Sequence, residues 1–186
     1  MQVDINQIKK GHAVDLGGEV YYVIDRQHVK PGKGGAFVRL KLKNVKLGTV
    51  VDRTLRSGEK MEMVYIEKKN IQYLYSSHDM YEFMDRDTFD QISLRKDQLG
   101  EVINYLKENI EVTALVYNKK VIALEPSIFV DMKIASTEPG IRGDTSRAGN
   151  KPAVTETGMN IIVPLFINKG DVVRVDTRTK EYTGRV

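Results

Sequence analysis

Cysteine and tryptophan are absent from this chain of 186 residues, and histidine occurs only three times. The lack of cysteine excludes disulfide bonds, thiolate zinc sites and cysteine nucleophiles, and it fits a reducing compartment. His12, His28 and His78 are scattered without the spacing of metal ligands. No G-x-S-x-G nucleophile elbow occurs either. The residues therefore offer no familiar catalytic constellation and no metal site.

Long apolar runs and a targeting segment are also missing. The first six residues lack the basic and apolar regions of a signal peptide, and no apolar run approaches the length that spans a bilayer. Hydrophobic residues make up 41% of the chain and charged residues 29%, as in a folded globular protein. We expect a cytoplasmic protein without a membrane partner.

Positive charge is concentrated in the first third of the chain. Residues 1–64 hold 12 Lys and Arg against 7 Asp and Glu, residues 65–127 hold 8 against 11, and residues 128–186 hold 9 against 7. An excess of cations at one end favours a polyanionic partner. A solvated surface with a chance asymmetry is the alternative, which the charge alone does not exclude.

Short strands dominate the pattern. Strands are predicted by β-branched and aromatic residues, or by period-two alternation, over 20–24, 38–43, 50–55, 70–75, 80–84, 112–117, 121–124, 128–130 and 160–167. In the strand predicted at 38–43, alternation places Arg39, Lys41 and Lys43 on one face and the apolar residues on the other. Short strands with frequent turns predict small barrels, so the fold class is mainly all-β.

One helix is predicted, with Asp97 as its N-cap. The apolar residues at helical spacing are Leu99, Val102, Ile103 and Leu106. The preceding aspartates, Asp85, Asp87 and Asp90, lack the glycine and terminal glutamate of a calcium loop, so we interpret them as a solvated acidic turn. The polar stretch 137–158 is much longer than ordinary connections, and we expect it to be either mobile or functional.

A glycine-rich loop separates the strands predicted at 20–24 and 38–43. Pro31 fixes one backbone angle, and Gly32, Gly34 and Gly35 leave Lys33 at a slim tip that could enter a narrow site. A hairpin turn with a solvated lysine is the alternative. A nucleotide-binding P-loop does not fit, because Gly34 replaces the Ser or Thr after the lysine and a strand follows where a helix is needed.

Cations gather on this hairpin and its exit, namely Lys30, Lys33, Arg39, Lys41, Lys43 and Lys46. Cations on a rigid barrel face can contact the phosphates of a nucleic-acid backbone. The tyrosines form no obvious stacking row, so backbone recognition of a folded RNA is favoured over single-strand binding on aromatic platforms. In a second loop, 140–149, Asp144 and Thr145 can cap their own backbone while Arg142 and Arg147 point outward. A self-capped surface loop is the alternative there.

In this order and at this separation, the two loops resemble those of the bacterial elongation factor P family. The first match covers 28–39 and 41–44. The matching segments of the last third are 138–140, 143–145, 151–153, 155–158, 163–167, 170–171, 175–177 and 182–185. Tyr73-Leu74-Tyr75 is similar to a run in the family's middle domain. The resemblance covers nearly the whole chain.

The resemblance implies three small β-barrels in a bent arrangement similar to the outline of tRNA. The first, residues 1–64, would be an SH3/KOW-like barrel that carries the Lys33 loop. Residues 65–127 and 128–186 would each form an oligonucleotide/oligosaccharide-binding barrel, hereafter OB barrel. We expect a monomer.

The resemblance also implies a translation factor that binds both ribosomal subunits, ribosomal RNA and peptidyl-tRNA between the peptidyl (P) and exit (E) sites. It would promote peptide-bond formation at stalled consecutive prolines without being an enzyme, and without a cofactor. Lys33 would stabilise the tRNA acceptor end after modification by a lysine-modifying enzyme. Lys30, Pro31, Gly32, Gly34 and Gly35 would form the tip loop. Further RNA contacts would come from Arg39, Lys41, Lys43, Gly143, Asp144, Thr145, Arg147, Tyr182 and Arg185.

Two other classes of protein stay open at this point. A general RNA-binding or chaperone protein of stacked barrels would bind many RNAs with similar affinity and no dependence on proline codons. A nucleotide-using enzyme would turn over ATP or GTP, but the missing Ser or Thr after Lys33 disfavours it.

Overall fold

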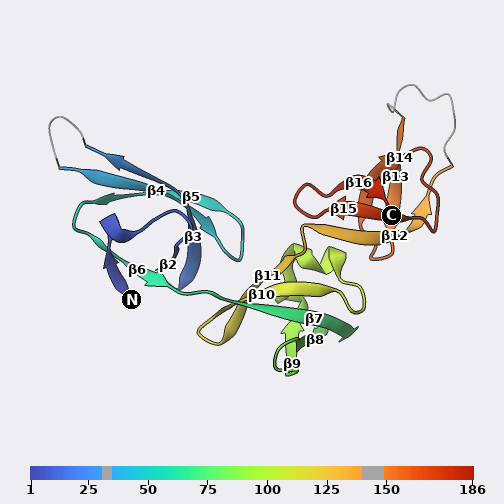
Figure 1. The fold of residues 1–186 in the computed structure, drawn as a ribbon, viewed down its shortest axis with the longest axis horizontal. Coiled ribbons are helices and arrows are strands. Elements are labelled where there is room, and N and C mark those ends of the chain that lie inside the picture. Colours follow the sequence, from blue (N-terminus) through green and yellow to red (C-terminus); the bar gives the residue numbers. More distant parts are fainter. Residues whose placement is uncertain (31–34, 140–148) are drawn as a thin grey trace. The chain divides into compact units, whose positions relative to one another are not determined.

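The computed structural model describes residues 1–30, 35–139 and 149–186. It is mostly β-structure, arranged in three sheets that form barrels (Figure 1). The chain divides into two compact units, residues 1–68 with 115–123 and residues 69–114 with 124–186. The predicted all-β class is confirmed, whereas the bent arrangement and the three domain boundaries stay predictions. In the part of the chain that is described, no helix has the length and apolar character needed to cross a membrane.

The first sheet has six strands in the order β1-β6-β2-β3-β4-β5. These strands are β1 (Gln2–Asp4), β2 (Ala13–Leu16), β3 (Glu19–Val29), β4 (Phe37–Asn44), β5 (Val50–Arg56) and β6 (Lys60–Val64), and a 3₁₀ turn, η1 (Ile5–Gln7), follows β1. The alternation predicted in β4 is confirmed, because Val38, Leu40 and Leu42 are fully buried while the cations between them are exposed. The buried set packs against Ile5 and Ile8 to form the core of this barrel.

The second sheet has five strands in the order β11-β10-β7-β8-β9. They are β7 (Glu67–Ser77), β8 (Met80–Asp85), β9 (Gln91–Arg95), β10 (Glu111–Tyr117) and β11 (Lys120–Pro126). Tyr73 is buried and its ring lies 5.4 Å from that of Phe83 on the neighbouring strand. Such tilted aromatic pairs add to the apolar burial that holds a sheet together.

The predicted helix is shorter than expected, and its predicted N-cap is wrong. An α-helix covers only Lys96–Leu99 (α1), Arg95 is its N-cap, and Asp97 lies in its first turn. The segment continues as a 3₁₀ helix, η2 (Gly100–Tyr105), because Gly100 takes a φ of 57° that an α-helix does not allow.

The acidic turn before β9 is not fully solvated as predicted, because Asp85 is only 2% exposed. Its carboxylate accepts hydrogen bonds from the Lys69 ammonium at 3.0 Å and from the backbone N–H groups of Asp87 and Thr88. The Lys69 hydrogen bond, together with these backbone donors, lowers the pKa of Asp85 below its ordinary value. Asp85 therefore ties the turn to β7, which is a structural role.

The third sheet has five strands in the order β14-β13-β12-β15-β16. They are β12 (Phe129–Thr137), β13 (Asn150–Thr155), β14 (Asn160–Pro164), β15 (Val172–Asp176) and β16 (Glu181–Arg185). The interpretation of 137–158 as one long connection was wrong for the second half of this segment, because β13 lies there and pairs with both β12 and β14. Alternation along β13 buries Ala153 and Thr155, which the polar composition had hidden.

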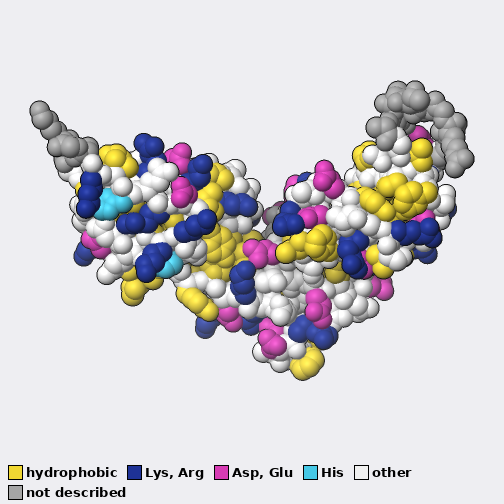
Figure 2. Space-filling view, turned by 45° about the horizontal axis from the view of Figure 1, so that its top comes forward, with side chains coloured by type: hydrophobic (Ala, Val, Ile, Leu, Met, Phe, Trp, Pro, Cys, Tyr) yellow, Lys and Arg dark blue, Asp and Glu magenta, His cyan; other side chains and the backbone are white. Residues whose placement is uncertain are grey.

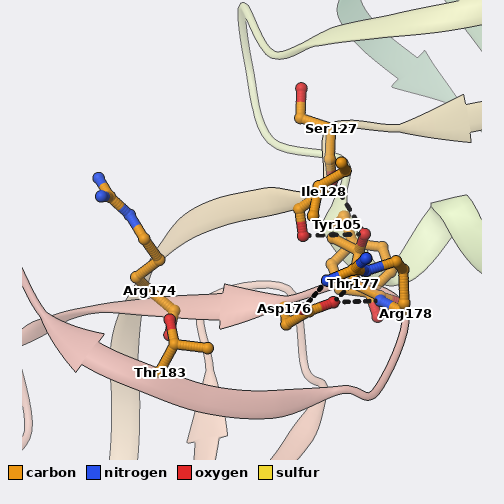
Figure 3. A network of polar contacts seen from close by, with 8 residues as sticks. All are labelled: Tyr105, Ser127, Ile128, Arg174, Asp176, Thr177, Arg178 and Thr183. Atoms are coloured by element: carbon orange, nitrogen blue, oxygen red, sulfur yellow. Dashed lines mark hydrogen bonds and ion pairs between the residues drawn. The ribbon is translucent and has the colours of Figure 1, made fainter.

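Tyr105, at the end of η2, belongs to the core of the third barrel rather than to that of the second. Its side chain is 1% exposed and packs with Val130, Met132 and Val175. Its hydroxyl donates a hydrogen bond to the Thr177 carbonyl at 3.2 Å (Figure 3). Burial raises the pKa of Tyr105, so the phenol stays protonated and can donate. The η2 segment and the third sheet therefore form a joint core.

Polar contacts reinforce this joint core on both sides of Tyr105. The Lys180 ammonium lies 2.8 Å from the Glu101 carboxylate, and the Thr157 hydroxyl donates to the Asn104 carbonyl at 2.6 Å. At the start of the turn between β15 and β16, the Asp176 carboxylate accepts hydrogen bonds from the backbone N–H and the guanidinium of Arg178 (Figure 3). The Arg178 hydrogen bonds lower the pKa of Asp176 from 3.8 to about 2.

The lowered pKa of Asp176 predicts a loss of stability in acid. A carboxyl whose pKa is lower in the folded state stabilises the fold above its unfolded pKa, and that contribution is lost as the pH falls from about 4 to about 2. Chemical denaturation at several pH values would show Asp176→Asn to be less stable than wild type at pH 7. The difference should vanish near pH 2, and a difference that is unchanged by pH would contradict the assignment.

Candidate nucleic-acid interface

The Lys33 loop connects two long paired strands of the first barrel. β3 and β4 pair up to Val29 and Phe37, and β5 pairs with β4 up to Arg56. We call residues 25–29, 37–41 and 52–56 of these strands the tip sheet. In Figure 1 the tip sheet extends beyond the rest of the first barrel. The tip sheet thus brings the two ends of the connection 30–36 together at its far edge.

The outer face of the tip sheet, opposite the barrel core, holds the cations predicted from the sequence. Arg39 and Lys41 are exposed there, and Arg56 lies across from Phe37 on the same face. Lys43 is exposed on the same face of β4, just beyond the tip sheet. Asp25 and Asp52 are the cross-strand neighbours of Lys41 on its two sides. A small hollow of about 160 Å³ is lined by Asp25, Gln27, Arg39, Lys41 and Asp52. Figure 2 shows acidic side chains among the basic ones on the first barrel.

The outer face can bind phosphates, but unevenly. Arg39 has the neutral residues Gln27 and Thr54 directly across the sheet, and Asp25 and Asp52 lie one row away in the same hollow. Lys41 lies between two carboxylates that would repel a phosphate.

The tip residues Pro31, Gly32, Lys33 and Gly34 lie outside the described residues. On either side of them, Lys30 and Gly35 are exposed. A side chain added at Gly35 would meet nothing within 4 Å among the described residues. Packing among the described residues therefore does not require glycine at position 35, and a narrow binding site is the other source of such a requirement.

Replacing Gly35 with alanine separates these two sources. We expect Gly35→Ala to leave the folded state intact and to change the free energy of unfolding by no more than about 1 kcal/mol, with stabilisation favoured. If the tip must enter a narrow site, the same variant should lower activity. Thermal unfolding and a translation assay measure the two effects, and a destabilised variant with full activity would contradict the interpretation.

The second predicted loop also lies largely outside the described residues, including Gly143, Asp144, Thr145 and Arg147. Its base is held by two side chains on β12 and β13. The Thr137 hydroxyl donates to the Pro152 carbonyl at 2.9 Å, and the Lys151 ammonium donates to the Glu138 carbonyl at 2.8 Å. Lys151 is only 4% exposed, so this buried ammonium serves the fold of the loop base.

The predicted C-terminal contacts, Tyr182 and Arg185, lie on β16. Tyr182 is half-buried and packs against the core of the third barrel. The Arg185 guanidinium lies 3.1 Å from the Asp171 carboxylate. Both side chains therefore have structural partners, and their predicted contact with RNA stays a prediction.

Sequence reasoning missed three cations of the tip sheet, namely Arg26, Arg53 and Arg56. Cross-strand register would have found Arg26 and Arg53, because both lie opposite Leu40, whose face was predicted correctly. Arg56 lies opposite Phe37, which is outside the predicted alternation. The residues the structure describes contain no group of three His, Asp or Glu side chains that could hold a metal ion.

The first barrel, with its paired strands and cationic outer face, and the two further β-sheets define a β-barrel protein with a surface suited to a nucleic-acid backbone. Three family models match successive parts of the chain: the elongation factor P KOW-like domain at residues 4–61, its OB domain at 66–124, and its C-terminal domain at 130–185. The chain belongs to the elongation factor P family.

Curated relatives match over the full length. Elongation factor P of Moorella thermoacetica is 51% identical over 183 residues, covering 98% of this chain and 99% of the relative. That of Natranaerobius thermophilus is 48% identical over 181 residues, covering 97% and 96%. The family assignment supports a translation elongation factor that interacts with the ribosome.

Solved structures support the fold alone. Eukaryotic translation initiation factor 5A from Methanococcus jannaschii is similar with a TM-score of 0.50 and 24% identity, over 66% of this chain and 90% of that one. A translation initiation factor 5A family protein from Naegleria fowleri has a TM-score of 0.55 and 12% identity, over 67% and 97%. At these identities the likeness carries no information on partners.

Proposed function

We propose that the protein binds the ribosome between the P and E sites, beside peptidyl-tRNA, and promotes peptide-bond formation at stalled consecutive prolines. The observation that carries the proposal is the tip sheet, which pairs β3 and β4 up to Val29 and Phe37 and so holds the Lys33 connection at its far edge. Membership of the elongation factor P family supports the same role.

Positioning is the physical basis of the proposed activity. Holding a slow reactant in its reactive geometry can lower a barrier by several kcal/mol without acid–base chemistry. A lysine at the end of a narrow sheet can place one cation against the phosphates of the tRNA acceptor end. In this proposal the factor is not an enzyme, because the ribosome supplies the reacting groups. It needs no cofactor.

The proposal gives separate roles to the predicted residues. Lys33 stabilises the acceptor end, in a form extended by a lysine-modifying enzyme, and Lys30, Pro31, Gly32, Gly34 and Gly35 keep the tip slim. Phosphate contacts come from Arg39, Lys41 and Lys43. In the third domain, RNA contacts come from Gly143, Asp144, Thr145, Arg147, Tyr182 and Arg185. The proposed partners are both ribosomal subunits, ribosomal RNA and peptidyl-tRNA, bound by a cytoplasmic monomer.

A reconstituted translation system tests this function. One message encodes three consecutive prolines and a matched message encodes three phenylalanines at the same place. Addition of the native protein should speed full-length synthesis from the proline message and leave the other unchanged. Equal effects on both messages would favour a general RNA-binding protein, and no effect on either would overturn the proposal.

A further inference from the structure

The small hollow on the outer face of the tip sheet is lined by charges that cancel. Arg39 and Lys41 contribute the positive charges, Asp25 and Asp52 contribute the negative ones, and Gln27 completes the lining. We call this site the outer hollow. Guanidinium and ammonium groups only donate hydrogen bonds, whereas ionised carboxylates only accept them. The outer hollow therefore offers donors and acceptors side by side.

These charged groups are not paired with one another. Among the described residues, no hydrogen bond or ion pair joins Arg39 or Lys41 to either carboxylate. Asp25 accepts one hydrogen bond, from the Gln27 amide at 3.3 Å, whereas the Asp52 carboxylate has no such partner in the described part of the chain. Arg39 and Asp52 are both exposed. Their polar groups are therefore available to a further molecule.

The balance of charge disfavours ions of either sign. A phosphate attracted by Arg39 would also approach the carboxylates of Asp25 and Asp52. A cation attracted by those carboxylates would approach Lys41, which lies between them. A neutral group with both donors and acceptors gains from both kinds of charge. The volume of about 160 Å³ is well below the about 300–1,000 Å³ of drug-sized pockets, so the outer hollow suits one small group.

Among the neutral groups of RNA, guanine matches this arrangement of donors and acceptors best. Its N7 and O6 atoms accept hydrogen bonds from an arginine in pairs, which is the commonest specific contact with a base. Its N1–H and N2–H groups are adjacent donors, and one carboxylate can accept from both. Adenine, cytosine and uracil carry acceptors on the corresponding edge, which a carboxylate would repel. An arginine beside a carboxylate therefore selects guanine.

The strand register sets the separation of Arg39 and Asp52. Arg39 of β4 lies opposite Thr54 of β5, and Asp52 lies two residues from Thr54, on the same face. Such diagonal neighbours are about 7–8 Å apart at the sheet. The long arginine side chain can therefore reach one edge of a base while the short carboxylate accepts hydrogen bonds from the other edge.

We infer that the outer hollow binds an unpaired guanine of RNA, with the Arg39 guanidinium donating to N7 and O6 and the Asp52 carboxylate accepting from N1–H and N2–H. The inference rests on the proposed function, and it adds a base contact to the phosphate contacts proposed for this face. Unpaired bases are the usual targets of sequence-specific RNA recognition, because their edges are accessible. Lys43 and Arg56 are exposed on the same face and stay available for the phosphates of the same RNA strand. One recognised base would fix the position of the tip sheet along its RNA.

Short RNA probes test the base contact on the intact protein. The probe is a short oligouridine with one central guanosine, and NMR titration of the ¹⁵N-labelled protein gives its affinity. We expect it to bind at least about tenfold more tightly than the same RNA with adenosine, cytidine or uridine at the centre. Inosine lacks the N2 amino group and 7-deazaguanosine lacks N7, so each should lose part of this preference. Equal affinity of wild type for all of these probes would overturn the inference.

Asp52→Asn separates a base contact from a phosphate contact, because the two predict opposite changes. If the outer hollow bound only phosphates, loss of a repelling carboxylate would tighten the binding of every probe. With guanine bound, Asp52→Asn should weaken the guanosine probe by about tenfold and not weaken the others. Asp79→Asn removes an exposed charge from the β7–β8 turn and should bind like wild type. Tighter binding of the guanosine probe to Asp52→Asn would refute the assignment. Circular dichroism shows whether each variant is folded, and the inosine probe on wild type decides the matter if Asp52→Asn is not.

Chemical probing with kethoxal, which modifies N1 and N2 of unpaired guanines, locates the base on the ribosome. The probe is the 70S ribosome with peptidyl-prolyl-tRNA in the P site. Wild type and Asp79→Asn should protect one guanine that stays reactive with Asp52→Asn. If wild type speeds proline synthesis but protects no such guanine, the inference fails and the proposed function stands. If wild type does not speed proline synthesis, the proposed function fails, and the RNA probes still decide whether the outer hollow binds guanine.

Discussion

Tyr105→Ala should lower the free energy of unfolding by about 3–5 kcal/mol. The ring is 1% exposed inside the core of the third barrel, although the residue belongs to η2, and its removal leaves a cavity among Val130, Met132 and Val175. The Thr177 carbonyl would also lose its donor. Loss of the ring should therefore loosen the third sheet and free η2 from it.

Urea denaturation followed by circular dichroism gives the size of the effect, and hydrogen exchange with mass spectrometry gives its location. Faster exchange should be confined to η2 and β12–β16. Tyr105→Phe removes only the hydrogen bond and should cost about 1 kcal/mol. Tyr75→Ala is the matched control, because that ring is 55% exposed and its loss should cost no more than about 0.5 kcal/mol. Equal losses for Tyr105→Ala and Tyr75→Ala would refute the joint core.

Lys33→Ala should slow peptide-bond formation between consecutive prolines by an order of magnitude or more, relative to wild-type protein at saturating concentration. Binding to the ribosome should change much less, because the remaining cations of the tip sheet are proposed to contact phosphates as well. The effect should therefore fall on the rate at saturation rather than on the concentration that gives half of the effect. Lys33→Arg keeps a charge but has another geometry, and an intermediate rate is expected.

Two comparisons make the Lys33 result specific. Lys60→Ala removes one exposed charge from β6 of the same barrel, outside the tip sheet, and should behave like wild type. The two Lys33 variants and the control should all unfold at the wild-type temperature, because each replaces a side chain for which no role in the fold is proposed. Wild-type rates with Lys33→Ala would eliminate the positioning role, whatever the affinity.

Local pattern was enough to predict most of the strands. Period-two alternation set the two faces of β4 correctly because side chains on a strand alternate strictly, and Leu40 and Arg39 illustrate both faces. The helix around Leu99 was overestimated because its apolar spacing continues past Gly100, whose backbone ends the α-helix. Strand β13 was hidden by polar composition, since the burial of Thr155 depends on pairing with distant strands.

The candidate site was predictable only in part. The exposed cations of β4 can be predicted from the alternation of that one strand. The acidic neighbours of Lys41, and the positions of Arg26 and Arg53 opposite Leu40, depend on how β3, β4 and β5 pair. Likewise, no local signal assigns Tyr105 to the core of another barrel. Such contacts join residues far apart in sequence, so they require the register and not only the pattern.

The central claim is that the Lys33 tip lies against the acceptor end of peptidyl-tRNA, and cryo-electron microscopy of the native protein on a proline-stalled ribosome tests it most directly. The account predicts continuous density from the tip sheet to the 3′ end of the tRNA, with the residue 33 side chain beside that end. Density that places residue 33 in open solvent, away from the tRNA terminus, would contradict it.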